Sequence, residues 1–314
     1  MLNYITKNKK IGVAKIGGAG DTIQLLFLIH ALRRKYSDYS ITAYVRDRNE
    51  YIIRDPAIDR IVFTGYCDWN KLVKKEAPKY DLFFDDRYIV GKWVKGKLKV
   101  KNENIYWNFF DYLNSFKGNL LEMSARGMGV KLIDSDYNLD FLIENDKLER
   151  LMFEPYIILH TGDDEVRKTK AYPIEYWNEL VKLLKNQYSD TPLIQVGTKE
   201  ETKIIEVVDL RGKTNFEELC GLIRGAILII TTEGLLPHLA KAFGVKAVVL
   251  FSATSKENFG YKENINIEGK LHCKNCWYTT DTWYKECPLT KEKRCYNMFT
   301  ILPEEIFSQI KSYL

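Results

Sequence analysis

Short runs of apolar, β-branched residues alternate along most of the chain with longer segments in which apolar residues recur at helical spacing. This alternation predicts strands followed by helices, and hence parallel sheets covered by helices on both faces. Between residues 142 and 154 the apolar periodicity gives way to charge, and we interpret this stretch as a linker. The sequence therefore predicts an α/β fold with two Rossmann-like domains, residues 1–150 and 151–314, whose sheets face each other across a ligand cleft.

The same pattern gives the expected elements. In the first half we expect an apolar helix from Asp21 to about Lys35, an irregular and then helical stretch over 92–129, and strands at 11–16, 41–46, 60–64 and 80–85. In the second half we expect helices at 174–186, 200–207, 216–224 and 236–243, and strands at 156–160, 193–197, 208–211, 227–232 and 247–251.

Composition narrows the class of protein. The 314 residues are 46% apolar and 28% charged, as in an ordinary soluble globular protein. No uncharged apolar run reaches the ~18 residues of a membrane span, and the start of the chain is polar and lysine-rich, unlike a signal peptide. We therefore expect a cytoplasmic protein, with peripheral contact at the inner face of the membrane as an option. The net charge of +5 is too small to indicate nucleic acid, but it favours an anionic substrate.

The junction between the first strand and the first helix combines a glycine turn with a carboxylate. Gly17-Gly18-Ala19-Gly20 follows the strand, and Asp21 stands at the start of the helix. Gly18 and Gly20 let a ligand approach the backbone, and the free N–H groups of the helix attract anions. Asp21 could act as a general base, or it could only cap the helix, and the loop alone leaves both roles open.

The second half carries similar junctions. His160-Thr161-Gly162 ends a strand, and Lys168 and Lys170 follow in a polar loop before Pro173 opens a helix. Thr161 and a lysine of this loop could hold a diphosphate, although loop lysines are more often simply solvated.

Two more strand ends carry candidate donor-binding residues. Glu233 and Gly234 open a helix after an apolar strand, where they could hold sugar hydroxyls and phosphate, while His238 lies one turn in and could contact a ligand or pack in the core. Lys213 and Thr214 follow another strand and could contact a base or a ribose.

Cysteines form the most specific pattern in the chain. Cys273, Cys276, Cys287 and Cys295 are separated by two, ten and seven residues, which is typical of a tetrahedral zinc or iron site with four thiolates. Two disulfides or free thiols are the alternatives, and the cytoplasm disfavours disulfides. Charged and aromatic residues interleave in this finger, residues 271–297, so it could contact a partner or acceptor as well as shield the core. The other cysteines are expected to be buried: Cys67 and Cys220.

Basic residues in the first half are candidate acceptor contacts. Arg46 and Arg48 come directly after a strand end, and residues 87–101 hold one arginine and five lysines without an acidic residue. This stretch could contact phosphorylated lipid sugars or an anionic membrane, or it could be a solvated loop.

Together these motifs resemble glycosyltransferase family 9, the heptosyltransferases, which have two facing Rossmann-like domains in the GT-B arrangement. The segment from Ile16 to Asp21 resembles the strand, glycine, aspartate and helix that open the family, so the resemblance implies that Asp21 is the catalytic base. Lys170-Ala171-Tyr172-Pro173 resembles the Lys-x-Trp-Pro motif, with tyrosine in place of tryptophan, which gives Lys170 the donor phosphate.

Further motifs of the family concern the donor nucleoside. Gly197 with Glu200 or Glu201 resembles a glycine and an acidic residue beside that nucleoside. The segment 209–214 resembles Leu-x-Gly-Lys-Thr, which gives a donor role to Lys213.

Glu233-Gly234 with His238 resembles a variant of a motif that is more often Asp-Ser/Thr-Gly followed by histidine. One branch of the family, which modifies bacterial autotransporter proteins, has an iron-bound finger that is similar to the cysteine pattern. The resemblance implies transfer of heptose from ADP-heptose to a glycan, lipid-linked or protein acceptor, as in lipopolysaccharide biosynthesis. No Asp-x-Asp metal clamp is obvious, so we expect direct, metal-independent transfer with inversion and no organic cofactor.

Two other classes of function fit parts of the sequence. A nicotinamide oxidoreductase would also begin with a strand, a glycine loop and a helix. However, Ile23 occupies the position of the third small residue in the dinucleotide-binding motif, and the next strand ends in Arg46 rather than in an acidic residue that would bind the ribose. A non-enzymatic binding protein would explain the cysteine finger and leave Asp21 and Lys170 without a role.

Overall fold

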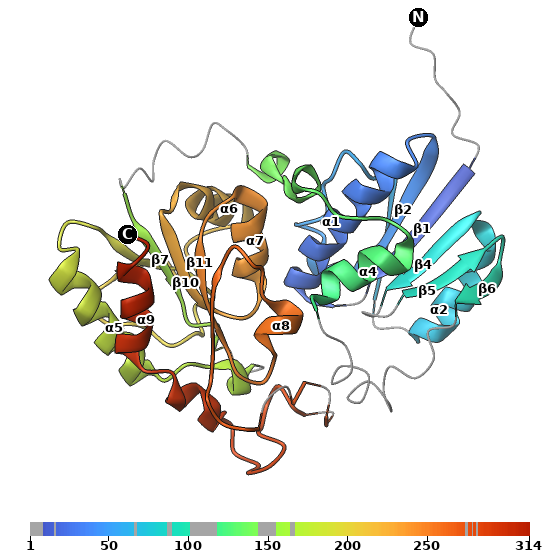
Figure 1. Ribbon diagram of the computed structural model, residues 1–314. Coiled ribbons are helices and arrows are strands. Elements are labelled where there is room, and N and C mark those ends of the chain that lie inside the picture. The colour runs from blue at the N-terminus through green and yellow to red at the C-terminus, as the bar shows by residue number, and fades with distance from the viewer. Residues whose placement is uncertain are drawn as a thin grey trace, which may run out of the picture. The chain divides into compact units, whose positions relative to one another are not determined.

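The computed structural model describes residues 9–15, 17–65, 68–86, 90–100, 118–143, 155–163, 167–273, 276–277, 279–280 and 282–314, without the side chains of residues 48 and 100. The chain divides into two compact units (Figure 1). Unit 1 comprises Met1–Phe109 and Leu120–Leu139, and unit 2 comprises Phe110–Asn119 and Asp140–Leu314.

Unit 1 is built on a six-stranded sheet in the order β3-β2-β1-β4-β5-β6. The first four strands in this order are parallel, and the last two are antiparallel. Helices α1 and α4 lie on one face of the sheet, and α2 lies on the other (Figure 1). The bounds are β1 Lys9–Lys15, α1 Ala19–Lys35, β2 Tyr39–Arg46, β3 Arg60–Thr64, α2 Trp69–Glu76, β4 Leu82–Asp86, β5 Val90–Val94, β6 Lys97–Val100 and α4 Leu120–Met128.

Helix α1 is apolar on nearly every side, and almost all residues from Thr22 to Leu32 are buried. Its charges are confined to the two ends, with Asp21 in the first turn and three basic residues in the last. This placement complements the helix dipole, and it leaves the middle of the helix for the core of unit 1.

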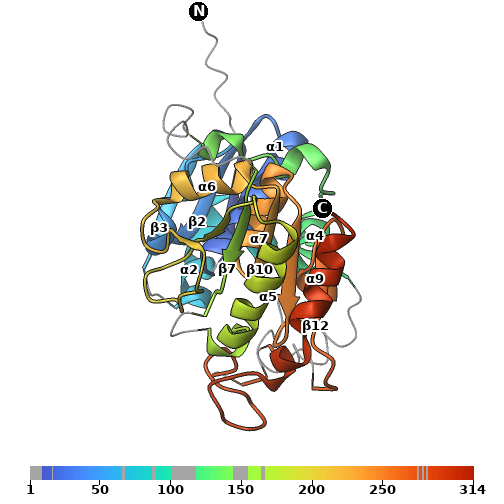
Figure 2. The same ribbon diagram turned by 90° about the vertical axis from the view of Figure 1, so that its left-hand side faces the viewer.

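Unit 2 is built on a second six-stranded sheet, fully parallel, in the order β12-β11-β10-β7-β8-β9. Helices α5 and α9 pack together on one face, the face toward the viewer in Figure 2, and α6 and α7 cover the other. The bounds are β7 Ile157–His160, α5 Ile174–Gln187, β8 Leu193–Gln195, β9 Val208–Asp209, α6 Phe216–Gly225, β10 Leu228–Thr232, α7 Leu235–Phe243, β11 Ala247–Phe251, α8 Lys256–Phe259, β12 Ile265–Glu268 and α9 Pro303–Lys311.

The predicted helix at 200–207 is wrong, because side chains occupy the backbone groups that a helix would need. Gln195 accepts a bond from the N–H of Ile204 and donates one to the carbonyl of Thr202, both at 2.8 Å. Glu206 also has a left-handed backbone with a φ of 59°. The segment is therefore a loop that is held against the end of β8.

Other elements were not predicted. Residues 92–100 were predicted to be irregular but belong to the antiparallel strands β5 and β6, and the sequence pattern also missed α2, α8, β12 and α9. Cys220 is fully buried in unit 2, as expected. Cys67 and residues 144–154 of the predicted linker lie outside the described residues.

Each sheet has one place where the strand order reverses. In unit 1 this switch point lies between β1 and β4, and in unit 2 it lies between β7 and β10. Parallel α/β sheets bind ligands beyond the carboxyl ends of the strands at such points. The predicted site residues around Asp21, Thr161 and Glu233 follow the strands β1, β7 and β10.

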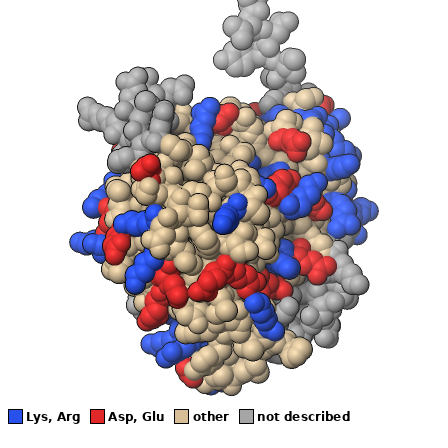
Figure 3. Space-filling model, turned by 60° about the vertical axis from the view of Figure 1, so that its left-hand side comes forward, with Lys and Arg blue, Asp and Glu red and all other residues tan. Residues whose placement is uncertain are grey.

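Charge is mixed over the surface. On the face in Figure 3, acidic and basic side chains are interspersed, and a row of acidic residues crosses it. Within the described part of the chain, no helix combines the length and the apolar character that crossing a bilayer requires.

Candidate functional site

The glycine turn of unit 1 folds Asp21 back onto the end of β1. The Gly18 N–H donates to Asp21 Oδ2 at 2.8 Å. A Cβ at Gly17 would lie 2.0 Å from this oxygen, so only glycine fits there. Gly20 lies in the first turn of α1, which begins at Ala19. Asp21 therefore does cap the helix, and this bond holds its carboxylate at the turn that follows β1.

Asn49 supports this turn and was missed in the sequence. Its Nδ2 donates to Thr22 Oγ1 at 2.7 Å, and it lies 3.4 Å and 3.3 Å from the carbonyls of Gly17 and Gly18. The side chain is buried, with 2% of its surface exposed. Asn49 thus fixes the backbone that positions Asp21.

A buried ion pair lies at the switch point of unit 1. Lys15 Nζ is 2.9 Å from Asp86 Oδ2, and both side chains are buried. Ser124 Oγ donates to the other carboxylate oxygen at 2.9 Å. The pair connects the ends of β1 and β4, and the only sequence signal for it was a lysine that ends an apolar strand.

In unit 2, Glu201 connects the loops after β7 and β8. Its Oε2 accepts bonds from Thr161 Oγ1 and the Gly162 N–H, each at 3.0 Å, and its Oε1 accepts one from the Thr198 N–H at 3.1 Å. Burial alone would raise the pKa of Glu201, but His160 and these N–H donors lower the pKa to about 2. Glu201 is therefore ionised and holds Thr161 in place.

The nucleoside candidates lie along the ends of β8 and β9. Gly197 has a φ of 140°, and a Cβ there would lie 2.5 Å from Glu201 Oε2. Glu200 is exposed to solvent, in contrast to its buried neighbour Glu201. Lys213 is exposed and donates to a backbone carbonyl of its own turn, and Thr214 is half-buried. These predicted residues line one edge of the sheet.

Lys170 and Glu233 form an ion pair beside the switch point of unit 2. Thr254 Oγ1 donates to Glu233 Oε2 at 3.0 Å, and the Lys170 ammonium lies 5.5 Å from the centre of the Trp283 ring. Burial alone would raise the pKa of Glu233, but Lys170, His238 and Thr254 lower it. The cluster thus holds an ionised carboxylate against an ammonium group that is also in reach of an aromatic face.

Lys168 has a different partner from Lys170. Its Nζ donates to the carbonyl of Asp163 at 3.3 Å and so lies against its own loop. Tyr172, which replaces the tryptophan of the family motif, is buried and donates its hydroxyl to the carbonyl of Ile301 at 2.8 Å. The tyrosine therefore ties the lysine loop to the start of α9.

The N-terminus of α7 lies beside a second cation. Gly234 is the residue before this helix, and a Cβ on it would lie 3.6 Å from Arg167 Nη1. Arg167 was missed in the sequence, although it directly precedes Lys168. His238 is buried, and its Nδ1 lies 2.7 Å from the Tyr261 hydroxyl. A helix N-terminus with two nearby cations is suited to an anion.

The basic side chains of unit 1 that are candidate acceptor contacts are partly or fully exposed, or lie outside the described residues. Arg46 ends β2 and is half-exposed, while the side chain of Arg48 lies outside the described residues. The lysine-rich stretch forms the β5–β6 hairpin from residue 90 to 100, and residues 87–89 and 101 lie outside the described part.

One Asp-x-Asp sequence does occur, at Asp134-Ser135-Asp136. Asp136 is buried, its Oδ2 lies 2.8 Å from Arg34 Nη2, and it accepts the Ile133 N–H at 2.9 Å. This aspartate therefore holds a loop of unit 1 against α1.

The four cysteines of the predicted finger are free thiols. Burial raises the pKa of Cys276 to about 12, and the nearby thiols of Cys295, Cys287 and Cys273 add to this rise. Nevertheless, among the residues that the structure describes, no three Cys, His, Asp or Glu side chains form a group that could hold a metal. The cysteines share one neighbourhood without forming a ready ligand set.

The cysteine segment packs against the lysine loop. The Trp277 N–H donates to the Ala253 carbonyl at 3.1 Å, and the Thr169 N–H donates to the Tyr284 carbonyl at 3.3 Å. Trp283 lies between these contacts in sequence and presents its ring to the Lys170 ammonium. The segment therefore forms part of the surroundings of Lys170.

Several solved structures with a similar fold are glycosyltransferases, and one, at a TM-score of 0.51, is the UDP-GlcNAc 2-epimerase from Methanocaldococcus jannaschii. The chain is 13% identical to E. coli ADP-heptose lps heptosyltransferase II over 97% of this chain and 98% of that chain, with a TM-score of 0.59. For E. coli heptosyltransferase WaaC with ADP-2-deoxy-2-fluoro heptose, the identity is 13%, the coverage is 97% and 100%, and the TM-score is 0.56. The chain is 15% identical to the iron-containing dodecameric glycosyltransferase TibC from enterotoxigenic E. coli. The match covers 97% of this chain and 75% of that chain, with a TM-score of 0.64. The fold is therefore the GT-B fold of glycosyltransferases, as predicted.

The family follows from the sequence. The model of glycosyltransferase family 9 (heptosyltransferase) matches residues 124–285, which is just over half of the chain. The chain belongs to glycosyltransferase family 9. No curated protein sequence matches it significantly. Membership of this family makes the chain a glycosyltransferase, and it sets aside both the nicotinamide oxidoreductase and the non-enzymatic binding protein.

Proposed function

We propose that this glycosyltransferase moves a heptose from ADP-heptose to a hydroxyl of a cell-surface glycan, a lipid-linked sugar or a protein, with inversion at the sugar carbon. The observation that carries the proposal is the cluster of Lys170, Glu233 and Arg167 at the N-terminus of α7. It combines cations and a carboxylate, the groups that a diphosphate and a sugar require, in a member of family 9.

On the donor side, Lys170 stabilises the leaving diphosphate. As the bond between the anomeric carbon and the phosphate oxygen breaks, negative charge gathers on the diphosphate. In this proposal Lys170, Arg167 and the first N–H groups of α7 stabilise this charge. The ionised carboxylate of Glu233 accepts hydrogen bonds from sugar hydroxyls, and Thr161 contacts the diphosphate. Gly197, Lys213 and Thr214 hold the nucleoside.

On the acceptor side, Asp21 acts as the general base. The acceptor hydroxyl loses its proton to the Asp21 carboxylate while its oxygen forms the new bond to the anomeric carbon. The diphosphate leaves from the opposite side of that carbon, so the configuration at the anomeric carbon is inverted. Asn49 fixes the turn that presents Asp21, and Arg46 and Arg48 are proposed acceptor contacts.

A thermal-shift panel of ADP, GDP, UDP and their sugars tests the donor. A ligand that binds only the folded state at about a hundredfold above its Kd adds about 2.7 kcal/mol of stability. We expect ADP and ADP-sugars to raise the Tm by several degrees, because ADP-heptose is the proposed donor. A clear shift with UDP or GDP ligands and none with ADP would reject heptose transfer from ADP-heptose while leaving sugar transfer intact.

We propose in addition that the four cysteines bind one zinc or iron ion. The thiol spacing supports this, and so does the proximity of Cys276 to the thiols of the other three cysteines. Because the thiols do not converge in the described structure, binding would draw them together. Such an ion stabilises the fold of the segment around Trp283 when bound.

Metal analysis of the purified chain checks this site. We expect close to one zinc or iron ion per chain, lost on replacing any one of Cys273, Cys276, Cys287 or Cys295 by serine. Cys220→Ser is the matched control, since Cys220 is buried in α6 and should leave the metal content unchanged. Stoichiometric metal in all four variants would place the site elsewhere.

A further inference from the structure

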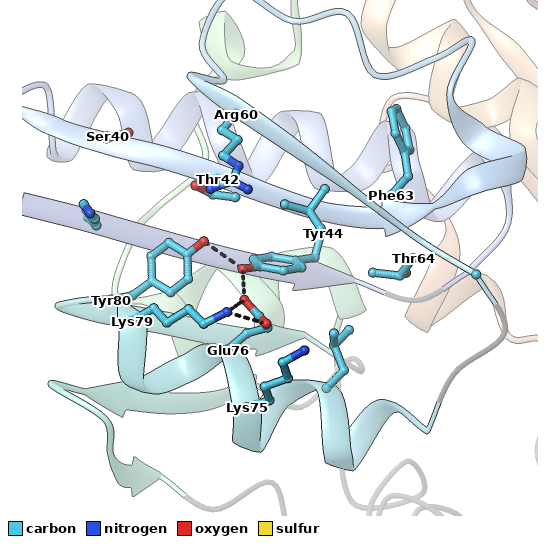
Figure 4. A pocket seen from close by; sticks show the side chains of 14 residues that line it. Ser40, Thr42, Tyr44, Arg60, Phe63, Thr64, Lys75, Glu76, Lys79 and Tyr80 are labelled. Carbon is cyan, nitrogen blue, oxygen red and sulfur yellow. Dashed lines mark hydrogen bonds and ion pairs between the residues drawn. The ribbon is translucent and has the colours of Figure 1, made fainter.

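Unit 1 has a pocket that the proposed transfer reaction does not use. It has a volume of about 590 Å³ and lies on the sheet face over β2 and β3, beside α2 (Figure 4). Alternate residues of β2, among them Thr42 and Tyr44, form its wall, and Arg60 lies opposite Thr42 in the register of β3. Helix α2 has only 8 residues, and it buries Trp69 and Val73 against the sheet. The short helix leaves the neighbouring part of the sheet open.

A hydrogen-bonded network fixes the floor of the pocket. The Tyr44 hydroxyl donates to Glu76 Oε2 at 2.8 Å, and it lies 2.8 Å from the Tyr80 hydroxyl. Lys79 Nζ donates to both oxygens of Glu76, at 2.7 Å and 2.8 Å. Burial alone would raise the pKa of Glu76, but Lys79 and Tyr44 lower it, so the carboxylate is ionised. The charge of Glu76 is therefore already balanced by Lys79.

Three more cations line the same pocket, from three different elements. They are Lys10 of β1, Arg60 of β3 and Lys75 of α2, and none of their side chains forms an ion pair with another described residue. With Lys79 and Glu76 included, the lining has a net charge of +3. Figure 4 shows Arg60 on one side of the Tyr44 hydroxyl and Lys75 and Lys79 on the other. Lys75 also helps to lower the pKa of Glu76, which is the only carboxylate among the lining residues, so positive charge remains in excess.

We propose that this pocket binds the phosphate monoester of a small hydroxylated molecule, either a soluble sugar phosphate or a lipid headgroup. A phosphate monoester has a charge near −2 at neutral pH, which offsets the lining better than a carboxylate does. The planar fork of Arg60 matches phosphate oxygens, and Lys75 adds a point charge. The hydroxyls of Ser40, Thr42 and Thr64 line the remaining space. The volume is typical of pockets for small ligands.

The pocket is separate from the candidate catalytic turn. Lys10 lies near the start of β1, whereas the turn that carries Asp21 follows Lys15 at its end. The five residue steps from Lys10 to Lys15 span about 17 Å of strand, and on β3 the lining extends from Arg60 to Thr64. The proposal therefore does not rest on the sugar transfer, and it stands if that function fails.

Calorimetric titration of the full chain with glucose 6-phosphate, inorganic phosphate and glucose tests the site. We expect glucose 6-phosphate to bind more tightly than inorganic phosphate, and glucose not to bind. Arg60→Gln and Lys75→Gln should each weaken binding about tenfold, because each removes a hydrogen bond between charged groups. In parallel, flotation with phosphatidic acid and phosphatidylcholine vesicles distinguishes the sources. The ligand is a lipid headgroup if phosphatidic acid vesicles capture the protein, phosphatidylcholine vesicles do not, and glucose 6-phosphate does not bind. This capture should be lost in Arg60→Gln and Lys75→Gln.

Lys74→Gln is the matched control, since Lys74 is an exposed residue of the same helix that does not line the pocket. It should bind as the parent does, and thermal unfolding of all three variants shows that each is folded. The proposal is overturned if neither glucose 6-phosphate nor phosphatidic acid vesicles bind. It is equally overturned if Lys74→Gln weakens binding as much as Arg60→Gln and Lys75→Gln.

Discussion

Asp21→Asn should lower the turnover of sugar transfer by about a hundredfold or more, because an amide cannot accept the proton of the acceptor hydroxyl. The amide oxygen can still accept the Gly18 N–H, so the helix cap and the fold should persist. Donor affinity should hardly change. Steady-state kinetics with a saturating donor, together with calorimetric binding of ADP, measure the two effects separately.

Asp68→Asn is the matched control for this variant. Asp68 is also a helix-capping aspartate of unit 1 and accepts the Lys71 N–H at 3.2 Å, but it precedes α2 rather than α1. This variant should turn over at the parental rate. Transfer by Asp21→Asn at near the parental rate would reduce Asp21 to a helix cap.

Lys170→Ala should weaken binding of the nucleotide-diphosphate sugar by roughly tenfold to a hundredfold, the range expected when a hydrogen bond to a charged group is lost. Binding of the matching nucleoside should be nearly unchanged, since the ammonium would contact phosphate and not the base. Calorimetric titration with adenosine, ADP and an ADP-sugar separates these contributions.

Lys168→Ala is the control for this second prediction, because Lys168 lies two residues away but donates to the Asp163 carbonyl. It should retain diphosphate binding. Equal losses for nucleoside and diphosphate in Lys170→Ala would contradict the phosphate role. A loss confined to Lys168→Ala would move that role to the neighbouring lysine.

Local sequence pattern determined most of the secondary structure. The apolar runs at Arg60–Thr64 and Ala247–Phe251 are strands over the predicted residues, and α1 ends at Lys35 as expected. The strand Ala247–Phe251 and most of α1 are buried, so hydrophobic periodicity and tertiary packing favour the same structure there, whereas in Arg60–Thr64 only Thr64 is buried. The lysine-rich hairpin of β5 and β6 was missed, since alternating lysines resemble a solvated loop, although they are also common on strands near a sheet edge.

The segment at 200–207 shows where local pattern is insufficient. Its apolar residues recur at helical spacing, but the side chains of Gln195 and Asn178 accept the N–H groups of Ile204 and Ile205. Both partners come from other elements, β8 and α5, so their competition with a helix exists only in the folded chain.

The sequence by itself determined which residue types stand at the strand ends, namely Asp21 after β1, Thr161 after β7 and Glu233 after β10. Only the tertiary structure decided their partners. Because β10 lies beside β7 in the sheet, Glu233 forms an ion pair with Lys170. Trp283, more than a hundred residues after Lys170 in the sequence, contacts the same ammonium group. Strand order and long-range packing set these contacts, and neither is encoded in the spacing of residues along one segment.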